Sequence, residues 1–239
     1  MSAAASAPAP ALRVEGLVFG WPRGDWRLRV PALALAPGER VFLHGPSGTG
    51  KSTLLNLIAG TLVPQQGRVE VGGAPMSALP GHRRDRLRAD RIGVLFQQFN
   101  LLPFLSPVEN VLLPCRFSAL RRERAVARFG SLEAAAATLL DHLGLGARAV
   151  GDRQAMALSV GQQQRVAAAR AVIGGPDLVI ADEPTSALDA DARDDFLSLL
   201  FAECEAAGSA LLFVSHDLAL AARFARSESL ARLTAPEAA

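Results

Sequence analysis

Tyrosine is absent from this chain of 239 residues, cysteine occurs twice, and Lys51 is the sole lysine among 25 basic side chains. Two cysteines that lie far apart exclude a disulfide scaffold and a cysteine-based zinc cluster, and they predict reduced thiols. The net charge is only +2, which excludes the strong positive field typical of nucleic-acid binding. We therefore expect no nucleic-acid partner.

Long hydrophobic runs are also missing. No stretch approaches the roughly 18 apolar residues that a membrane-spanning helix needs. The Ala/Ser/Pro-rich residues 1–11 lack the basic and apolar regions of a signal peptide, so we predict a disordered tail there and a cytoplasmic location. Half of the chain is hydrophobic, which predicts one domain with a sizeable core over residues 12–239.

The single lysine lies in a glycine-rich segment, GPSGTGKS at residues 45–52, which has the pattern of a phosphate-binding loop. An apolar run at 40–44 before it predicts a strand, and residues 52–60 have helical spacing. In this setting, backbone N–H groups converge on phosphate oxygens at a helix N-terminus. The predicted nucleotide-binding residues of this segment are Gly45, Ser47, Gly48, Thr49, Gly50, Lys51, Ser52 and Thr53.

A lone lysine in an arginine-rich chain indicates a site that requires a compact cation. Arginine is a wide planar fork, whereas lysine is a point charge on a flexible stem. Lys51 is predicted to reach the β- and γ-phosphates of a nucleotide, and the Ser52 hydroxyl to bind Mg²⁺. At this stage the loop is compatible with kinases, GTPases, motors and transport ATPases alike.

A second candidate motif follows the apolar residues 178–181, which read as a buried parallel strand. Asp182 and Glu183 come directly after it, where the end of a parallel strand meets a ligand crevice. Asp182 suits an outer ligand of Mg²⁺, and Glu183 could polarise an attacking water. The alternative is an ordinary surface pair of carboxylates. With a further strand at 210–214, the predicted fold class is α/β with a mostly parallel sheet.

The octapeptide LSVGQQQR at 158–165 resembles the signature of the ATP-binding subunits of ATP-binding-cassette (ABC) transporters, LSGGQ followed by QR. Other motifs of that family follow in its order. Gln97 stands where the family has its Q-loop, Ser186–Asp189 resembles the D-loop, and His216 matches the switch histidine. The resemblance covers about residues 12–224.

This resemblance implies a RecA-like P-loop core, an antiparallel β-subdomain over 12–35 and 67–73, and an inserted helical subdomain at about 100–160. It also implies ATP and Mg²⁺ as cofactors and a homodimer that forms on ATP binding, in which each signature caps the ATP held by the other subunit. The roles carried over are catalytic for Glu183, His216 and Gln97, metal-binding for Ser52, Gln97 and Asp182, and nucleotide-capping for Ser159, Gly161, Gln162 and Asp189.

The chain departs from the family pattern at two positions. Val160 stands where the signature usually has glycine, so we expect ordinary backbone dihedrals there, because positive φ is costly for a β-branched residue. The family usually stacks adenine on an aromatic residue near the N-terminus, often tyrosine. Trp21 stands at that position here, with Phe19 as the competing candidate.

Residues Gln97 to Val111 include an irregular apolar stretch between two prolines, which indicates a protein interface. The resemblance implies that this region receives an integral-membrane permease and holds the protein on the inner face of the membrane. The sequences FQQFNLLP at 96–103 and VENVLLP at 108–114 resemble those of the branch that contains lipoprotein-releasing and macrolide-exporter ATPases. The arginine clusters at 83–91 and 121–124 read instead as solvated helix faces.

Three functions remain open. The favoured one is an ATPase that powers a permease for export or extraction of lipoprotein, lipid, peptide or drug-like cargo. The second is a mechanotransmitting ATPase that is coupled to an extracytoplasmic enzyme and moves no cargo. The third, a soluble ABC protein of DNA repair or translation, is disfavoured because the chain has one cassette and no coiled coil between its motifs.

Overall fold

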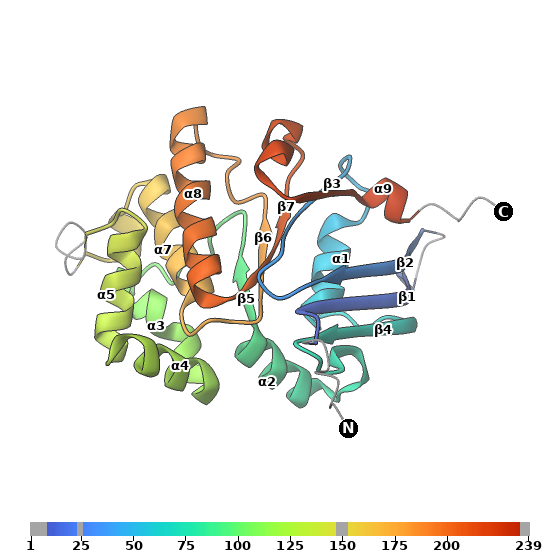
Figure 1. Ribbon diagram of the computed structural model, residues 1–239, viewed down its shortest axis with the longest axis horizontal. Coiled ribbons are helices and arrows are strands. Elements are labelled where there is room, and N and C mark those ends of the chain that lie inside the picture. The colour runs from blue at the N-terminus through green and yellow to red at the C-terminus, as the bar shows by residue number, and fades with distance from the viewer. Residues whose placement is uncertain (1–8, 23–25, 147–152, 235–239) are drawn as a thin grey trace, which may run out of the picture.

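The computed structural model of the protein describes residues 9–22, 26–146 and 153–234 and contains two β-sheets (Figure 1). One sheet is antiparallel with the order β2-β1-β4, and the other is parallel with the order β5-β6-β7-β3-β8. The strands are β1 (Leu12–Gly20), β2 (Arg27–Leu35), β3 (Arg40–His44), β4 (Gln66–Val71), β5 (Ile92–Leu95), β6 (Leu178–Asp182), β7 (Ala210–Val214) and β8 (Arg226–Ser229). The predicted α/β class with a mostly parallel sheet is confirmed.

The helices lie between and beside the strands in sequence. Those of α type are α1 (Lys51–Ile58), α2 (Gly81–Arg91), α3 (Pro107–Phe117), α4 (Ala119–Phe129), α5 (Leu132–His142), α7 (Val160–Val172), α8 (Ala190–Ala207) and α9 (Leu230–Leu233). Three short 3₁₀ turns, at Met76–Ala78, Ala155–Ala157 and Leu218–Arg223, complete the described elements. No helix in this described part of the chain has the length and apolar character needed to cross a bilayer.

The apolar strands β3, β5, β6 and β7 of the parallel sheet are largely buried on both faces, as parallel strands of this composition require. On β3, Val41 and Leu43 face the cluster shared with α1 and the antiparallel sheet, whereas Phe42 faces the cluster shared with α7 and α8. Helix α1 lies between the two sheets, with Leu54 and Ile58 fully buried. This packing fixes the start of α1, and therefore the glycine-rich segment before it.

The helical subdomain lies at the far end of the parallel sheet from the antiparallel one and consists of α3, α4, α5 and the adjoining α7 (Figure 1). Helix α3 follows the irregular apolar stretch and starts at a capping box, in which Ser106 and Glu109 exchange side-chain and backbone bonds. These bonds lower the pKa of the Glu109 carboxyl. Residues 147–152 of this region lie outside the described residues.

Ordered structure begins before β1. Residues 1–8 of the predicted tail lie outside the described residues. Ala11 is buried, and its carbonyl accepts a bond from Gly72 N at 3.0 Å. The prediction of a disordered tail is therefore wrong for Ala11.

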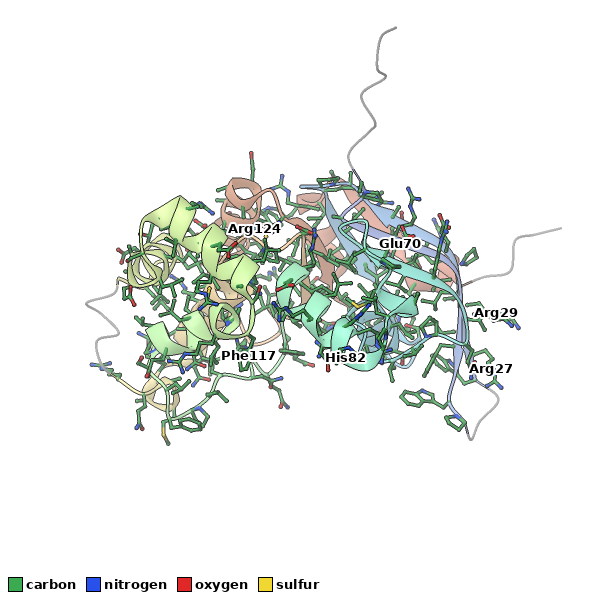
Figure 2. All side chains as sticks on the ribbon, turned by 90° about the horizontal axis from the view of Figure 1, so that it is seen from below. Arg27, Arg29, Glu70, His82, Phe117 and Arg124 are labelled. Carbon is green, nitrogen blue, oxygen red and sulfur yellow. The ribbon has the colours of Figure 1, made fainter. Side chains whose placement is uncertain are left out.

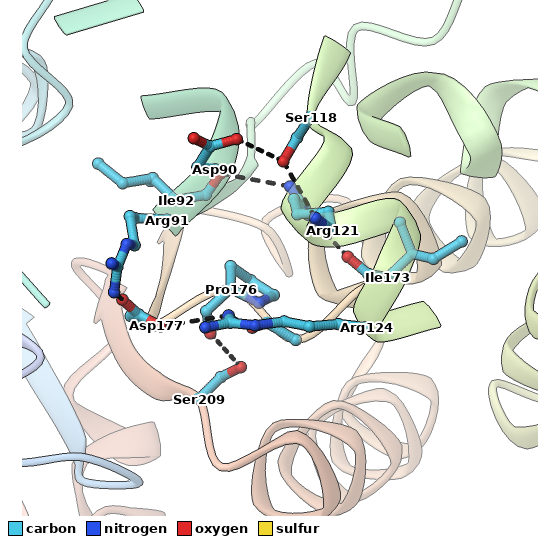
Figure 3. A network of polar contacts seen from close by, with 11 residues as sticks. Asp90, Arg91, Ile92, Ser118, Arg121, Arg124, Ile173, Pro176, Asp177 and Ser209 are labelled. Carbon is cyan, nitrogen blue, oxygen red and sulfur yellow. Dashed lines mark hydrogen bonds and ion pairs between the residues drawn. The ribbon is translucent and has the colours of Figure 1, made fainter. Parts of the chain in front are cut away.

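The prediction of a solvated arginine face on α4 is wrong for Arg121. This side chain is 2% exposed and donates to Ile173 O at 2.7 Å (Figure 3). It also donates to Ala171 O at 2.7 Å. Burial lowers its pKa to about 10. Backbone carbonyls, with no sequence signature of their own, provide the partners, so the pattern of charges could not predict this burial.

Arg124 and the earlier run at 83–91 also turn partly inward. Arg124 donates to Gly175 O at 2.6 Å and pairs with Asp177, which also pairs with Arg91 of α2 at 2.5 Å (Figure 3). Arg84 donates to Gly60 O at 3.1 Å and to Leu79 O at 2.8 Å. These half-buried arginines therefore join the helical subdomain and α2 to the core.

Candidate active site

A cavity of about 600 Å³ opens beside the glycine-rich segment, at the carboxyl ends of β3 and β6. Residues that are far apart in the sequence, and that were predicted to act on the phosphates of the nucleotide, line this cavity together. Its lining residues are Trp21, Trp26, Ser47, Gly48, Gly50, Lys51, Ser52, Thr53, Gln97, Asp182, Glu183 and His216.

The glycine-rich segment forms the turn that its pattern predicts. Gly48 and Gly50 have φ values of 80° and 100°, in the left-handed region that favours glycine. The Lys51 ammonium donates to Gly45 O at 2.6 Å and to Pro46 O at 3.1 Å. Thr49 also bonds this turn, through Oγ1 to Pro46 O at 2.8 Å. The lysine is thus held over its own loop by carbonyls that a phosphate could replace as partners.

Two tryptophans flank this turn. Trp21 is 48% exposed and lines the cavity, whereas Phe19 is buried and packs edge-to-face on Trp21 with ring centroids 5.1 Å apart. Burial excludes Phe19 as a stacking surface and favours Trp21. Trp26 also lines the cavity, and a Cβ at Gly50 would lie 2.7 Å from its ring. Sequence reasoning missed Trp26, since its proximity to Gly50 depends on how β2 passes the loop.

Glu183 and His216 contact each other directly. Glu183 Oε1 lies 2.9 Å from His216 Nδ1, and the Ser215 hydroxyl donates to Oε2 at 3.1 Å. Glu183 has a φ of 47°, which is costly for a non-glycine residue, and its N–H donates to Val214 O at 2.9 Å. The end of β7 therefore holds this carboxylate at the cavity wall. The sequence predicted both residues in the site but not their pairing.

Asp182 has the chemistry of a metal ligand. Burial raises the pKa of its carboxyl, the Glu183 carboxylate raises it further, and Lys51 partly offsets both. Two adjacent carboxylates with one nearby ammonium gain from a divalent cation. The described residues contain no group of three or more His, Cys, Asp or Glu side chains that could hold a metal. The oxygens of Ser52, Gln97 and Asp182, which share the cavity, instead fit Mg²⁺ held together with phosphates.

The signature residues lie away from this cavity. Helix α7 begins at Val160, five residues earlier than the periodic segment 165–173 predicted, with Ser159 as its N-cap. Ser159 Oγ accepts from Gln162 N at 3.3 Å, and Gln162 bonds back in a capping box. Val160 is absent from the residues with positive φ, as predicted.

Ser159 is exposed, and so is Asp189, which caps α8 by accepting from Ala192 N at 2.9 Å. Neither they nor Gly161 and Gln162 line the cavity that holds Lys51. Within one chain the two halves of the predicted nucleotide site are therefore not brought together.

A second cavity, of about 700 Å³ and mainly apolar, lies between α1, α2 and α3, beside β5 and β6. We call it the α3 groove. Phe96, Asn100, Leu113 and Phe117 line it, and Ser52 and Asp182 line both this groove and the nucleotide cavity. Phe117 is 72% exposed, and Figure 2 places it along the same edge of the molecule as His82 of α2.

A comparison with protein families identifies the family to which this chain belongs. Residues 28–186 match the model of a family described as ABC transporter. The chain belongs to the ABC transporter family. It is an ATPase cassette of that family, and it binds ATP, as the glycine-rich turn and the ordered motifs predicted.

Curated relatives agree with the branch that the sequence resembles. The lipoprotein-releasing system ATP-binding protein LolD of Cereibacter sphaeroides is 43% identical over 90% of this chain and 94% of its own length. The uncharacterized ABC transporter ATP-binding protein YbbA of Escherichia coli K12 is 44% identical over 80% of each chain. The macrolide export ATP-binding/permease protein MacB of Chromobacterium violaceum is 37% identical over 90% of this chain, and this chain spans 32% of the length of that protein.

Two solved structures of a similar cassette are dimeric. The dimeric post-hydrolysis state of the ATP-binding cassette MJ0796, bound to ADP and Pi, superimposes with a TM-score of 0.74 at 31% identity, over 91% of this chain and 93% of that one. A second dimeric structure of MJ0796, a bacterial ABC transporter cassette, superimposes equally well, with a TM-score of 0.74 and 32% identity. The similarity extends over nearly the whole chain and confirms the fold.

We expect the fluorescence of the two tryptophans to report nucleotide binding, because both line the cavity and the chain has no tyrosine. Trp21→Phe removes the reporter at that position, and Trp21→Ala should weaken ATP binding about fivefold, since aromatic stacking contributes about 1 kcal/mol. Titration with ATP and with tripolyphosphate, which has no base, separates the two rings. Trp26, beside the loop, should respond to both ligands, and Trp21 to ATP alone.

Trp26→Phe is the matched control for this titration. It should keep the difference between ATP and tripolyphosphate, because Trp21 remains. If Trp26→Phe removes that difference and Trp21→Phe preserves it, then the base stacks on Trp26 and the assignment of Trp21 is wrong.

Proposed function

We propose that this cassette hydrolyses ATP to power an integral-membrane permease, which docks in the α3 groove. The supporting observation is the groove itself: it is mainly apolar, Phe117 stands exposed at it, and its wall continues to Ser52 and Asp182 in the nucleotide cavity. An exposed apolar surface of this size indicates a protein partner. The groove extends beyond the predicted region Gln97 to Val111, because α3 contributes Leu113 and Phe117 to it.

Within the nucleotide cavity the residues have distinct proposed tasks. Lys51 binds the β- and γ-phosphates in place of the carbonyls it contacts now. Ser52, Gln97 and Asp182 hold Mg²⁺, which would neutralise phosphate charge when bound. Glu183 accepts a proton from the attacking water, and Ser215 and His216 fix the direction of its carboxylate.

The signature acts on the nucleotide of a second copy. Ser159, Gly161 and Gln162 lie at the N-terminus of α7, where the helix dipole and free N–H groups favour an anion, yet they do not line their own chain's cavity. Asp189 is exposed at the start of α8 in the same way. A homodimer that closes on ATP would supply these groups in trans. The dimeric MJ0796 cassettes support this arrangement.

The relatives suggest the kind of permease. LolD and MacB are named for lipoprotein release and macrolide export, so we propose export or extraction of lipoprotein, lipid, peptide or drug-like cargo from the inner face of the membrane. Mechanotransmission without cargo is the second candidate, since the same groove and the same nucleotide cycle would serve it. The cargo would be selected by the permease.

Purification from the native host in mild detergent tests the proposal. We expect a membrane protein with transmembrane helices to co-purify with the wild type, and to be recovered at least about tenfold less with Phe117→Asp, because a charge in an apolar docking site costs more than 1.4 kcal/mol. Val126→Asp, at an exposed site on α4 outside the groove, is the matched control and should retain the partner. Recovery of ribosomes or DNA instead, or equal recovery with Phe117→Asp, would refute the proposal.

A further inference from the structure

The segment that follows Gln97 has an unusual backbone. Phe99 and Asn100 are consecutive residues with φ values of 57° and 48°, and Glu183 is the one other non-glycine residue with positive φ in the described part of the chain. Asparagine tolerates this region, but a bulky residue such as Phe99 rarely adopts it. A conformation of this kind persists where surrounding contacts hold it.

The carbonyls of this segment are held by one side chain, Arg170, while Phe99 N–H donates to Phe96 O at 3.0 Å and the Phe99 ring is buried in the core. Arg170 Nη1 donates to Asn100 O at 2.7 Å, and its Nη2 donates to Phe99 O. The planar guanidinium presents two donors in a fixed fork, which lysine cannot do. The carbonyls of both positive-φ residues are thus fixed by a single group.

The Arg170 guanidinium binds backbone carbonyls rather than a carboxylate. Among the described residues, no carboxylate lies within ion-pairing distance of it. Burial without a counter-charge lowers the pKa of its guanidinium. Such burial is unfavourable unless the donors are matched, and here the matching acceptors are the two loop carbonyls.

The position of Arg170 links three parts of the protein. It lies in the last turn of α7, whose N-cap is Ser159 of the signature. It lines the α3 groove together with Asn100. Gln97, three residues before Asn100, lines the nucleotide cavity. A displacement of α7 would therefore be passed through Arg170 to the loop that connects the two cavities.

We propose that Arg170 is a positioning residue, which fixes the backbone behind Gln97 and couples the signature helix to the nucleotide cavity and the α3 groove. This coupling rests on the proposed function, in which the signature contacts the partner's nucleotide. The clamp on the loop does not depend on it, because the contacts are present in a single chain without nucleotide.

Amide hydrogen exchange on the nucleotide-free protein tests the clamp directly. In Arg170→Met and in Arg170→Lys we expect exchange of the amides at 99–101 to accelerate at least about tenfold, because two carbonyls lose their fork. Arg84→Met is the matched control, since Arg84 also donates to two carbonyls, Gly60 O and Leu79 O, but on α2. It should leave exchange at 99–101 unchanged. Unchanged exchange in Arg170→Met would overturn the proposal.

A rescue experiment separates positioning from general stabilisation. We expect Arg170→Met to lower kcat about tenfold with the ATP dissociation constant within twofold, as for a group that acts on the reacting geometry. Adding Asn100→Gly should restore part of kcat, because glycine adopts positive φ without support at one of the two positions that Arg170 holds. If kcat is not restored, or if ATP affinity falls as much as kcat, then Arg170 is only structural. Failure of the wild type to turn over ATP would instead refute the proposed function.

Discussion

Replacing Glu183 with glutamine should slow ATP turnover by at least ~100-fold while ATP still binds, since a positioned general base contributes a factor of this order. Glutamine has the same shape as glutamate, and its amide can keep a partner in Ser215 and in His216, so the local structure should survive. The variant loses only the ability to accept the proton. Turnover is measured by phosphate release, and affinity by titration of the tryptophan fluorescence.

The variant should also accumulate as an ATP-bound dimer in size-exclusion chromatography, because in the proposed homodimer the nucleotide between the two copies would no longer be cleaved. Glu205→Gln, at an exposed position near the end of α8, is the matched control and should behave as the wild type. Near-normal turnover in Glu183→Gln would mean that another group accepts the proton.

A mixture of two inactive variants should recover activity. Lys51→Ala removes the phosphate contact of its own chain, and Ser159→Arg places a bulky charge at the signature. In the mixed dimer one site contains both defects, whereas the other combines an intact Lys51 with an intact Ser159. We expect each variant alone to lose at least ~100-fold in turnover, and the purified heterodimer to regain about half of the wild-type rate.

The control addresses the loss of a helix cap, because Ser159 also caps α7. Ser131 caps α5 in the same way, by accepting from Ala134 N at 3.1 Å. Ser131→Arg removes a helix cap, which lowers the free energy of unfolding by about 1 kcal/mol. It should nevertheless leave turnover near that of the wild type. A heterodimer of Lys51→Ala and Ser159→Arg that stays inactive would contradict action in trans.

Apolar runs and glycine turns predicted much of the fold. The strand expected at 40–44 is β3, those at 178–181 and 210–214 are β6 and β7, and the phosphate-binding turn precedes α1 as expected. These segments are short and continuous, so local pattern and burial agree. The start of α7 was predicted five residues late, because a polar capping box does not continue the hydrophobic period.

Long-range contacts account for what the sequence could not predict. Arg121 looked like part of a solvated face, yet it donates to carbonyls more than forty positions away along the chain. Trp26 joins the nucleotide cavity because β2 passes the glycine-rich turn. The roles assigned to the site residues stay predictions, although the cavity gathers those expected to act within one chain.

Ser52 and Asp182 belong to the walls of both cavities, so each occupant would rest against residues that also serve the other. Thermodynamic linkage then imposes a symmetry on the pair. If a membrane partner in the groove tightens ATP binding by a certain factor, ATP must tighten the hold on that partner by the same factor. An energy-transducing complex of this kind would become less firmly assembled whenever cellular ATP runs low.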